Sequence, residues 1–255
     1  MSKFDSHTEW TARICEKQQS PEYQQACRHF QSECDRLAQA FSQLPIQEWM
    51  QACQKNTVRT EWAVGSTLHR GFYCPSPVYD LLVGNVKRGV IRKNGIPVEN
   101  RSHVYGFDEA GRLLWCKSLY NAKAAYTEYL TYCDSRIFGV TVSEQGEVMS
   151  LTEEVYAEGR IVSYLYGLCL NPEGTVKIAE LSCEYYTYDE EGLCGTQWHR
   201  YIHADTEGSF SGKKPLWMQQ PFYRTDSYRF VRKNGYLDSY TNGISTYKVR
   251  SRRKA

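Results

Sequence analysis

The chain has 255 residues, of which 41% are hydrophobic and 24% charged, and its formal net charge is +2. This composition predicts a folded protein with a substantial core and excludes a chain that is disordered over most of its length. No run of residues approaches the roughly 18–20 apolar residues of a membrane span, and the polar start of the sequence predicts no signal peptide. We therefore expect a protein that does not associate with a membrane.

The first 56 residues have the spacing of helices. Ser6 and Glu9 match a capping box, and Ser20 followed by Pro21 predicts the start of a second helix. The apolar residues after it recur every three or four positions, which is the helical period: Tyr23, Cys27, Phe30, Cys34, Leu37 and Phe41. Beyond Pro45, a third helix is predicted by another stripe: Ile46, Trp49, Met50 and Cys53. Because short helices need tertiary contacts, we expect this helical subdomain to pack against the rest of the chain.

Residues 57–90 form a connecting segment with weaker signals. Val58–Val64 is compatible with a strand, and Ser76 before Pro77 is typical of a helix start. Gly84 and Gly89 interrupt the helical pattern that follows. This segment is expected to link the helices to the next region.

At residue 91 the spacing of the apolar residues changes from the helical period of 3.6 to the strand period of 2, which continues to residue 249. Turn sequences such as Asn94-Gly95, Glu158-Gly159 and Asn234-Gly235 alternate with β-branched and aromatic runs. Most of the 20 tyrosines fall in these runs, where large flat side chains suit a pleated surface. Consecutive hairpins predict a twisted antiparallel β-meander of eight to eleven strands, and residues 250–255 form a basic tail. The expected fold class is α+β, with the helices packed on the meander.

Two segments of this region share the pattern aromatic-x-aromatic-Asp-x-x-Gly. They begin at Tyr105 and at Tyr186, and each places its aspartate directly before a predicted turn. This pattern resembles the YD repeat of the shells of Rhs-type bacterial toxins. The resemblance implies an array of β-hairpins and a small companion protein of a bacterial toxin system, by analogy of fold.

Catalytic and metal-binding motifs do not occur in the sequence. No two of the ten cysteines lie within four residues of each other, so the usual zinc knuckle is excluded, and no phosphate-binding loop is found. His199 and His203 are close in sequence, but in a strand their rings stand about 13 Å apart, too far to share an ion. We therefore predict no metal site and no cofactor. The cysteines are interpreted as reduced core residues of a cytoplasmic protein.

Charge is unevenly distributed along the chain. Residues 143–191 hold eleven acidic and two basic residues, whereas residues 213–255 hold eleven basic and two acidic ones. In one interpretation these charges form ion pairs between neighbouring strands, or they are simply solvated. In another, a charged face attracts a charged partner. The basic segment could also contact nucleic acid, but no recognisable binding module is present, so a nucleic-acid partner is not expected.

These features predict a non-catalytic protein-binding protein, in particular a bacterial immunity-type inhibitor that neutralises a partner toxin with a basic active site. Acidic and tyrosine side chains of neighbouring strands are the predicted partner-binding residues: Glu153, Glu154, Tyr156, Tyr164, Tyr166, Glu184, Tyr186 and Tyr188. A competing interpretation packs these tyrosines beneath the helices. The alternative function is a hydrolase-type enzyme with a Cys/His or carboxylate site in a sheet cleft.

Overall fold

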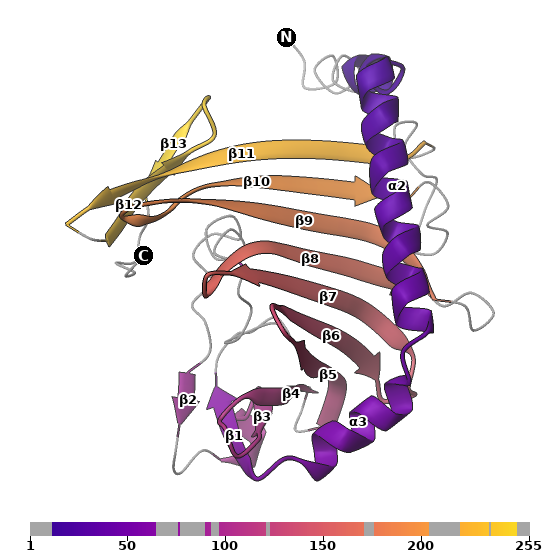
Figure 1. Ribbon diagram of the computed structural model, residues 1–255, viewed down its shortest axis with the longest axis vertical. Coiled ribbons are helices and arrows are strands. Elements are labelled where there is room, and N and C mark those ends of the chain that lie inside the picture. The colour runs from indigo at the N-terminus through magenta and orange to yellow at the C-terminus, as the bar shows by residue number, and fades with distance from the viewer. Residues whose placement is uncertain are drawn as a thin grey trace.

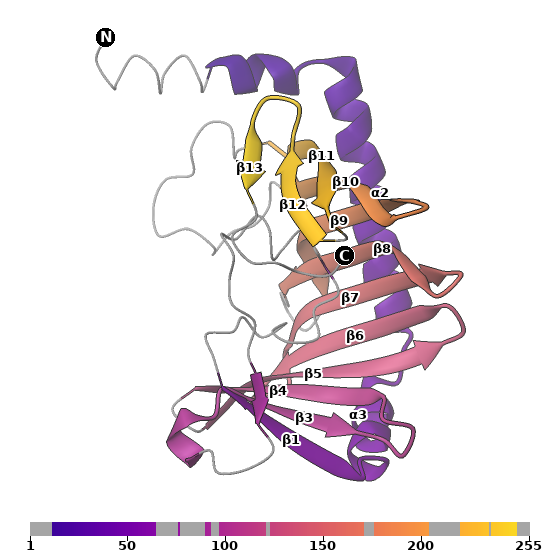
Figure 2. The ribbon, with the colours of Figure 1, turned by 90° about the vertical axis from the view of Figure 1, so that its left-hand side faces the viewer.

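The computed structural model describes residues 12–64, 76, 90–92, 97–120, 123–170, 176–203, 220–234 and 236–248. In these residues one antiparallel sheet runs through the molecule, and the helices α2 (Pro21–Ser42) and α3 (Ile46–Lys55) lie against one of its faces (Figures 1 and 2). The predicted α+β class, with helices before an antiparallel meander, is confirmed.

Helix α2 begins at the predicted position. Ser20 Oγ accepts a hydrogen bond from Tyr23 N at 3.2 Å, and Pro21 occupies the first turn, where its missing N–H costs nothing. All six residues of the predicted apolar stripe are buried, and the stripe of α3 packs against the same core. A helical stretch at 12–18 precedes α2, and the capping box predicted at Ser6 lies outside the described residues.

The described residues form thirteen strands, and eleven of them begin within the meander predicted at 91–249, which agrees with the eight to eleven strands expected there. The strands are β1 (Arg59–Val64), β2 (Val90–Arg92), β3 (His103–Phe107), β4 (Leu113–Tyr120), β5 (Lys123–Cys133), β6 (Arg136–Ser143), β7 (Val148–Ala157), β8 (Arg160–Leu170), β9 (Lys177–Asp189), β10 (Gly192–Ile202), β11 (Phe222–Lys233), β12 (Tyr236–Thr241) and β13 (Thr246–Lys248). A short 3₁₀ helix, η2 (Val98–Asn100), precedes β3. Neighbours in space follow the chain from β3 to β13, while β1 lies between β3 and β2.

The segment expected to be a connection contributes to the sheet. Trp62 of β1 lies opposite Val104 of β3 on one side and Arg92 of β2 on the other. The strand predicted at Val58–Val64 is therefore confirmed, and it adds to the strand count. Ser76 is described and has no regular secondary structure, whereas the rest of the helix predicted there and the basic tail at 250–255 lie outside the described residues.

Tight turns join the long central strands. Asp134 (φ 47°) lies between β5 and β6, and Glu158 (φ 52°) and Gly159 (φ 75°) lie between β7 and β8. Two successive residues with positive φ form a turn whose twist matches that of the paired strands. Turns of this kind hold the register, and the register decides which side chains share a face.

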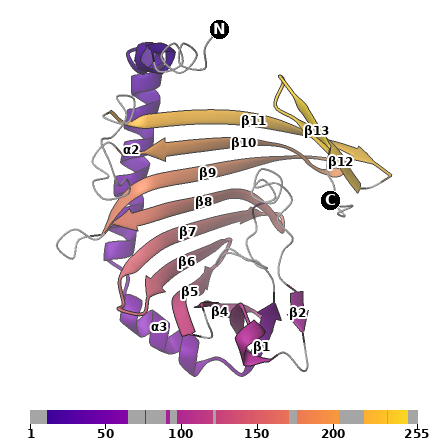
Figure 3. The same ribbon diagram turned by 180° about the vertical axis from the view of Figure 1, so that it is seen from behind.

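The main core lies between α2 and the sheet. Leu151, Leu165 and Leu181 of β7, β8 and β9 are almost fully buried in it. Tyr23 Oη accepts a hydrogen bond from Tyr223 N at 2.6 Å and joins α2 to the beginning of β11. Helix α2 crosses only one end of strands β9 to β11, and the other ends extend beyond it (Figure 1, and from behind in Figure 3).

Candidate protein-binding site

Three of the predicted partner-binding residues form one row across the sheet, on the face opposite α2. Glu154 of β7 lies opposite Tyr164 of β8, and Tyr164 lies opposite Glu184 of β9. Their side chains are 8%, 2% and 4% exposed, respectively. The register therefore places a buried carboxylate on each side of a buried tyrosine.

Each carboxylate of this row is bonded to a tyrosine two residues further along its own strand. Tyr156 Oη donates to Glu154 Oε2 at 2.8 Å, and Tyr186 Oη donates to Glu184 Oε2 at 2.6 Å. The expectation that Tyr156 shares a face with Glu154 is confirmed, because side chains alternate along a strand. The hydroxyl of the buried Ser76 lies 2.7 and 2.6 Å from the two carboxylate oxygens of Glu184, so a residue from between β1 and β2 contacts this face.

Glu154 titrates unusually for a glutamate. Burial raises its pKa from the ordinary 4.5 to about 7, the hydrogen bond from Tyr156 lowers it, and the nearby charge of Glu128 raises it. Burial also raises the pKa of Tyr156, as does the neighbouring Glu154. Glu154 therefore changes its charge near neutral pH.

The remaining predicted tyrosines pack on the same face as this row. Tyr188 Oη donates to Ile161 O at 2.7 Å, which joins β9 to β8. The residues of this cluster are Tyr164, Tyr186, Ile161, Tyr166, Tyr188, Leu193 and Trp198. They pack against one another on the side of the sheet away from α2, so the interpretation that placed these tyrosines beneath the helices is wrong.

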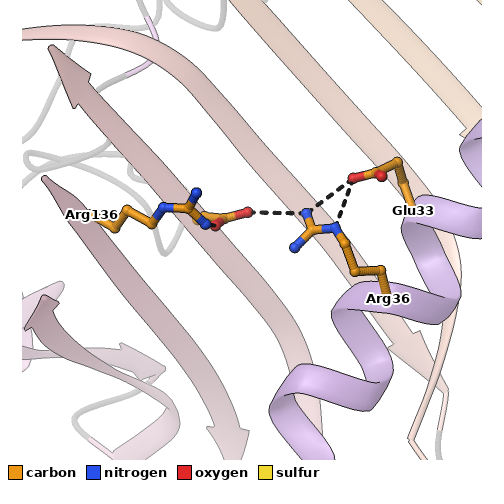
Figure 4. A network of polar contacts seen from close by, with 4 residues as sticks. Glu33, Arg36 and Arg136 are labelled. Atoms are coloured by element: carbon orange, nitrogen blue, oxygen red, sulfur yellow. Dashed lines mark hydrogen bonds and ion pairs between the residues drawn. The ribbon is translucent and has the colours of Figure 1, made fainter.

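Glu153 is the one predicted partner-binding residue on the face of the sheet that α2 packs against. Its Oε1 accepts a hydrogen bond from Arg136 Nη1 at 2.8 Å, and its Oε2 accepts one from Arg36 Nη2 at 3.3 Å. The Nε of Arg36 also donates to Glu33 Oε2 at 3.0 Å (Figure 4). Two arginines, one from β6 and one from α2, therefore share a single buried carboxylate of β7.

The two arginines of this network are functional candidates that no sequence pattern indicates. Arg36 and Glu153 are 117 residues apart, so no local motif links them. Glu153 is only 3% exposed, whereas the side chains of Arg36 and Arg136 are 46% and 51% exposed. The carboxylate therefore lies beneath the guanidinium groups, and solvent meets mainly the cations.

The strands that extend beyond α2 present a second surface, here called the open face. It is formed by the exposed, α2-side residues of three strands: Tyr185, Thr187, Gln197, Ser227, Arg229 and Val231. Tyr185 of β9 lies opposite Gln197 of β10, which lies opposite Ser227 of β11. Tyr185 is 40% exposed and Val231 is 47% exposed. Burial raises the pKa of Tyr185 to about 12, and the charges of Arg36 and Glu153 act on it as well, so this surface adjoins the region of those two residues.

The opposite charges of the two biased segments are partly paired across strands. Arg232 of β11 approaches Asp189 at 3.1 Å and Glu191 at 3.7 Å, both at the β9–β10 turn. Glu180 of the acidic segment pairs with Arg200 of β10, which lies outside the basic segment, at 2.6 Å. For these residues the interpretation in which neighbouring strands pair their charges is confirmed.

The described cysteines are free thiols, and most of them are buried. Burial raises the pKa of Cys27 to about 11 and the pKa values of Cys34 and Cys169 to about 12. Such thiols are protonated at neutral pH and are poor nucleophiles. His199 lies in β10, as predicted, with Nδ1 2.9 Å from Tyr223 Oη. These contacts describe core packing and do not form a Cys/His catalytic pair.

No helix in the part of the chain that the structure describes is long and apolar enough to cross a membrane. Comparison with known proteins gave no assignment: no protein-family model matches this chain, and no curated protein matches its sequence.

Proposed function

We propose that this protein is a non-catalytic protein-binding protein, in particular an immunity-type inhibitor that neutralises a partner toxin in the bacterial cytoplasm. The observation that carries the proposal is the open face. It offers an exposed tyrosine, Tyr185, and an exposed valine, Val231, on a sheet surface beside half-exposed arginines. Tyrosine and arginine are the residue types that most often dominate protein interfaces.

The buried carboxylates support a binding role over the hydrolase alternative. Glu154 and Glu184 each accept a hydrogen bond from a tyrosine of their own strand, and Glu184 also contacts Ser76. Carboxylates that are buried and bonded in this way belong to an interior polar network. Together with the protonated state of the buried thiols, this arrangement is typical of a structural interior.

The toxin-related part of the proposal rests on the hairpin array and on its resemblance to YD repeats. Asp108 and Asp189, the aspartates of the two repeat-like segments, both accept backbone hydrogen bonds in the turns that follow β3 and β9. The free thiols suit a reducing compartment.

Affinity purification of the full chain from its own cells tests this proposal. We expect one protein to be recovered in a stoichiometric amount, to form a complex with the purified chain, and to be a toxin whose growth inhibition is relieved by co-expression. The product of the neighbouring gene is the first candidate. Recovery of no stoichiometric partner, or a purified pair that does not associate, would contradict a binding function.

A further inference from the structure

The charged groups beside the open face are arranged by depth. Arg36 and Arg136 are about half exposed, while the carboxylates that neutralise them, Glu153 and Glu33, are 3% and 27% exposed. An approaching molecule therefore meets guanidinium groups before it meets carboxylates. Because electrostatic interactions weaken with distance and with screening by water, the outer cations dominate what a partner contacts.

Both guanidinium groups retain N–H donors. Arg136 uses Nη1 for Glu153, and Arg36 uses Nε and Nη2 for Glu33 and Glu153. In Figure 4 each guanidinium also carries a nitrogen from which no dashed line starts. A guanidinium offers five N–H donors in a planar fork that matches a carboxylate, so donors are left for a second acceptor. The hydrogen bonds to Glu153 orient the guanidinium groups of Arg36 and Arg136 in the absence of a partner.

Arg229 extends this cationic surface across the open face. It lies on β11, on the same side as Ser227, and it is exposed. In the described part of the chain it has no ion pair, in contrast to Arg224 and Arg232 on the same strand. Tyr185, at 40% exposure, stands on β9, two strands away from Arg229. The surface thus combines an aromatic contact area with cations on two sides.

We infer that the open face, together with Arg36 and Arg136, binds an acidic segment of a partner protein. Carboxylates of that segment pair with the outer N–H groups of Arg36, Arg136 and Arg229, and an apolar part of it packs on Tyr185. This inference rests on the proposed function and gives the binding surface and the charge of the partner. It also reverses the sign expected from the sequence, which predicted acidic side chains facing a basic partner.

A nucleic acid fits this surface less well than an acidic protein segment. The three arginines are offset by Glu33 and Glu153, which leaves a small net positive charge at the site. Binding to a phosphate backbone generally uses many cations, whereas a short acidic segment needs only a few well-placed guanidinium groups.

Site-specific photocrosslinking locates the surface in the full chain. A benzophenone amino acid replaces Tyr185 in one variant and Tyr126 in another, because both tyrosines are 40% exposed but lie on opposite faces of the sheet. We expect the partner to crosslink from position 185 and not from position 126. Crosslinking from position 126 alone would overturn the inference and leave the proposed function standing. No crosslinked protein from either position, with no stoichiometric partner on affinity purification, would contradict both.

Calorimetry with the purified partner then tests the charge of the interface. Arg229→Gln and Arg136→Gln are each expected to weaken binding by about tenfold or more, as loss of an interface arginine often does. Arg112→Gln is the matched control, because Arg112 is 57% exposed and paired with Asp108 at a distant turn. Circular dichroism checks that each variant is folded. If Arg136→Gln does not fold, Arg229→Gln alone tests the inference. If Arg229→Gln, and Arg136→Gln where it folds, bind the partner with the affinity of the wild type, the inference is overturned.

A probe that needs no partner completes the test. In NMR titrations of the full chain, a hexaglutamate peptide is expected to shift the amide signals of Thr187 and Arg229, and a hexalysine peptide is expected to leave them in place. A thymidine oligonucleotide serves as the third ligand. Equal shifts with both peptides, or stronger binding of the oligonucleotide than of hexaglutamate, would overturn the assignment to an acidic protein segment.

Discussion

Arg136 Nη1 donates to Glu153 Oε1 at 2.8 Å across the β6–β7 pair, and it does so at the margin of the surface that α2 leaves uncovered. The carboxylate is 3% exposed and the arginine 51% exposed, so one partner is interior and the other is at the surface. Arg36 of α2 bonds the other oxygen of Glu153. This contact therefore links helix, sheet and candidate interface in one network.

Replacement of Arg136 should destabilise the fold. In Arg136→Met the buried carboxylate of Glu153 keeps only its 3.3 Å hydrogen bond to Arg36, and we expect the free energy of unfolding to fall by about 1–3 kcal/mol. Urea denaturation monitored by circular dichroism measures the change. In a Glu153→Gln background the same replacement should cost clearly less, because no charge is then left buried. Equal costs in the two backgrounds would show that the ion pair does not stabilise the protein.

Glu154 should make stability depend on pH. Its pKa is about 7 in the folded protein and near 4.5 when unfolded, so the folded state binds more protons and stability falls as the pH rises from about 4.5 through 7. At about pH 8 the cost of ionising this buried group approaches about 3 kcal/mol. Glu154→Gln removes this cost, so the variant should have a higher melting temperature than the wild type at pH 8. The difference between the two melting temperatures should be smallest at about pH 5.

Tyr156→Phe provides the companion test for Glu154. It removes the hydrogen bond that lowers the pKa of Glu154 in the folded protein, so the fall in stability should extend to higher pH. Melting curves at several pH values compare the two variants with the wild type. A pH profile that is the same in all three proteins would show that Glu154 is not the titrating group.

The cysteines should differ widely in reactivity. Cys133 is exposed, whereas Cys34 and Cys169 are buried, with pKa values near 12. With N-ethylmaleimide at about pH 7.5, mass spectrometry of peptides should show rapid labelling of Cys133 and labelling of the two buried thiols only after unfolding in urea. Labelling of Cys34 at the rate of Cys133 in the folded protein would mean that α2 detaches readily from the sheet.

Gly139 should not tolerate a side chain. A Cβ at this position of β6 would overlap with Thr152 Oγ1 and lie 3.0 Å from Glu128 Oε1. Gly139→Ala is therefore expected to lower the free energy of unfolding by about 1–3 kcal/mol, the usual cost of overpacking. Thr152→Ala removes the closest atom, so the double variant should be more stable than the sum of the single effects predicts. Additive effects in urea denaturation would contradict this account.

Local patterns in the sequence determined most of the secondary structure. The cap at Ser20 and the six-residue stripe after it predicted α2, because a helix brings residues three and four positions apart onto one face. Asp134 and the glycine of the Glu158-Gly159 pair predicted turns because aspartate and glycine adopt positive φ more readily than most residues. The turns predicted the hairpins of the 91–249 region but not the pairing of β1, which lies before the hairpin signals and pairs with β3, about forty residues later.

Only the tertiary structure decided which of the predicted site residues act together. Glu153 and Glu154 are adjacent in sequence, yet strand alternation sends one toward α2 and the other to the opposite face. The sequence predicted both as surface acids, but burial depends on what packs over each face, and this is set by contacts between distant segments such as Arg36 with Glu153 and Ser76 with Glu184. The exposed Tyr185 and Arg229 stand out for the same reason: they lie on β9 and β11, strands that extend beyond α2. Periodicity is a local property that a sequence displays directly, whereas exposure and pairing arise only when the chain brings remote residues together.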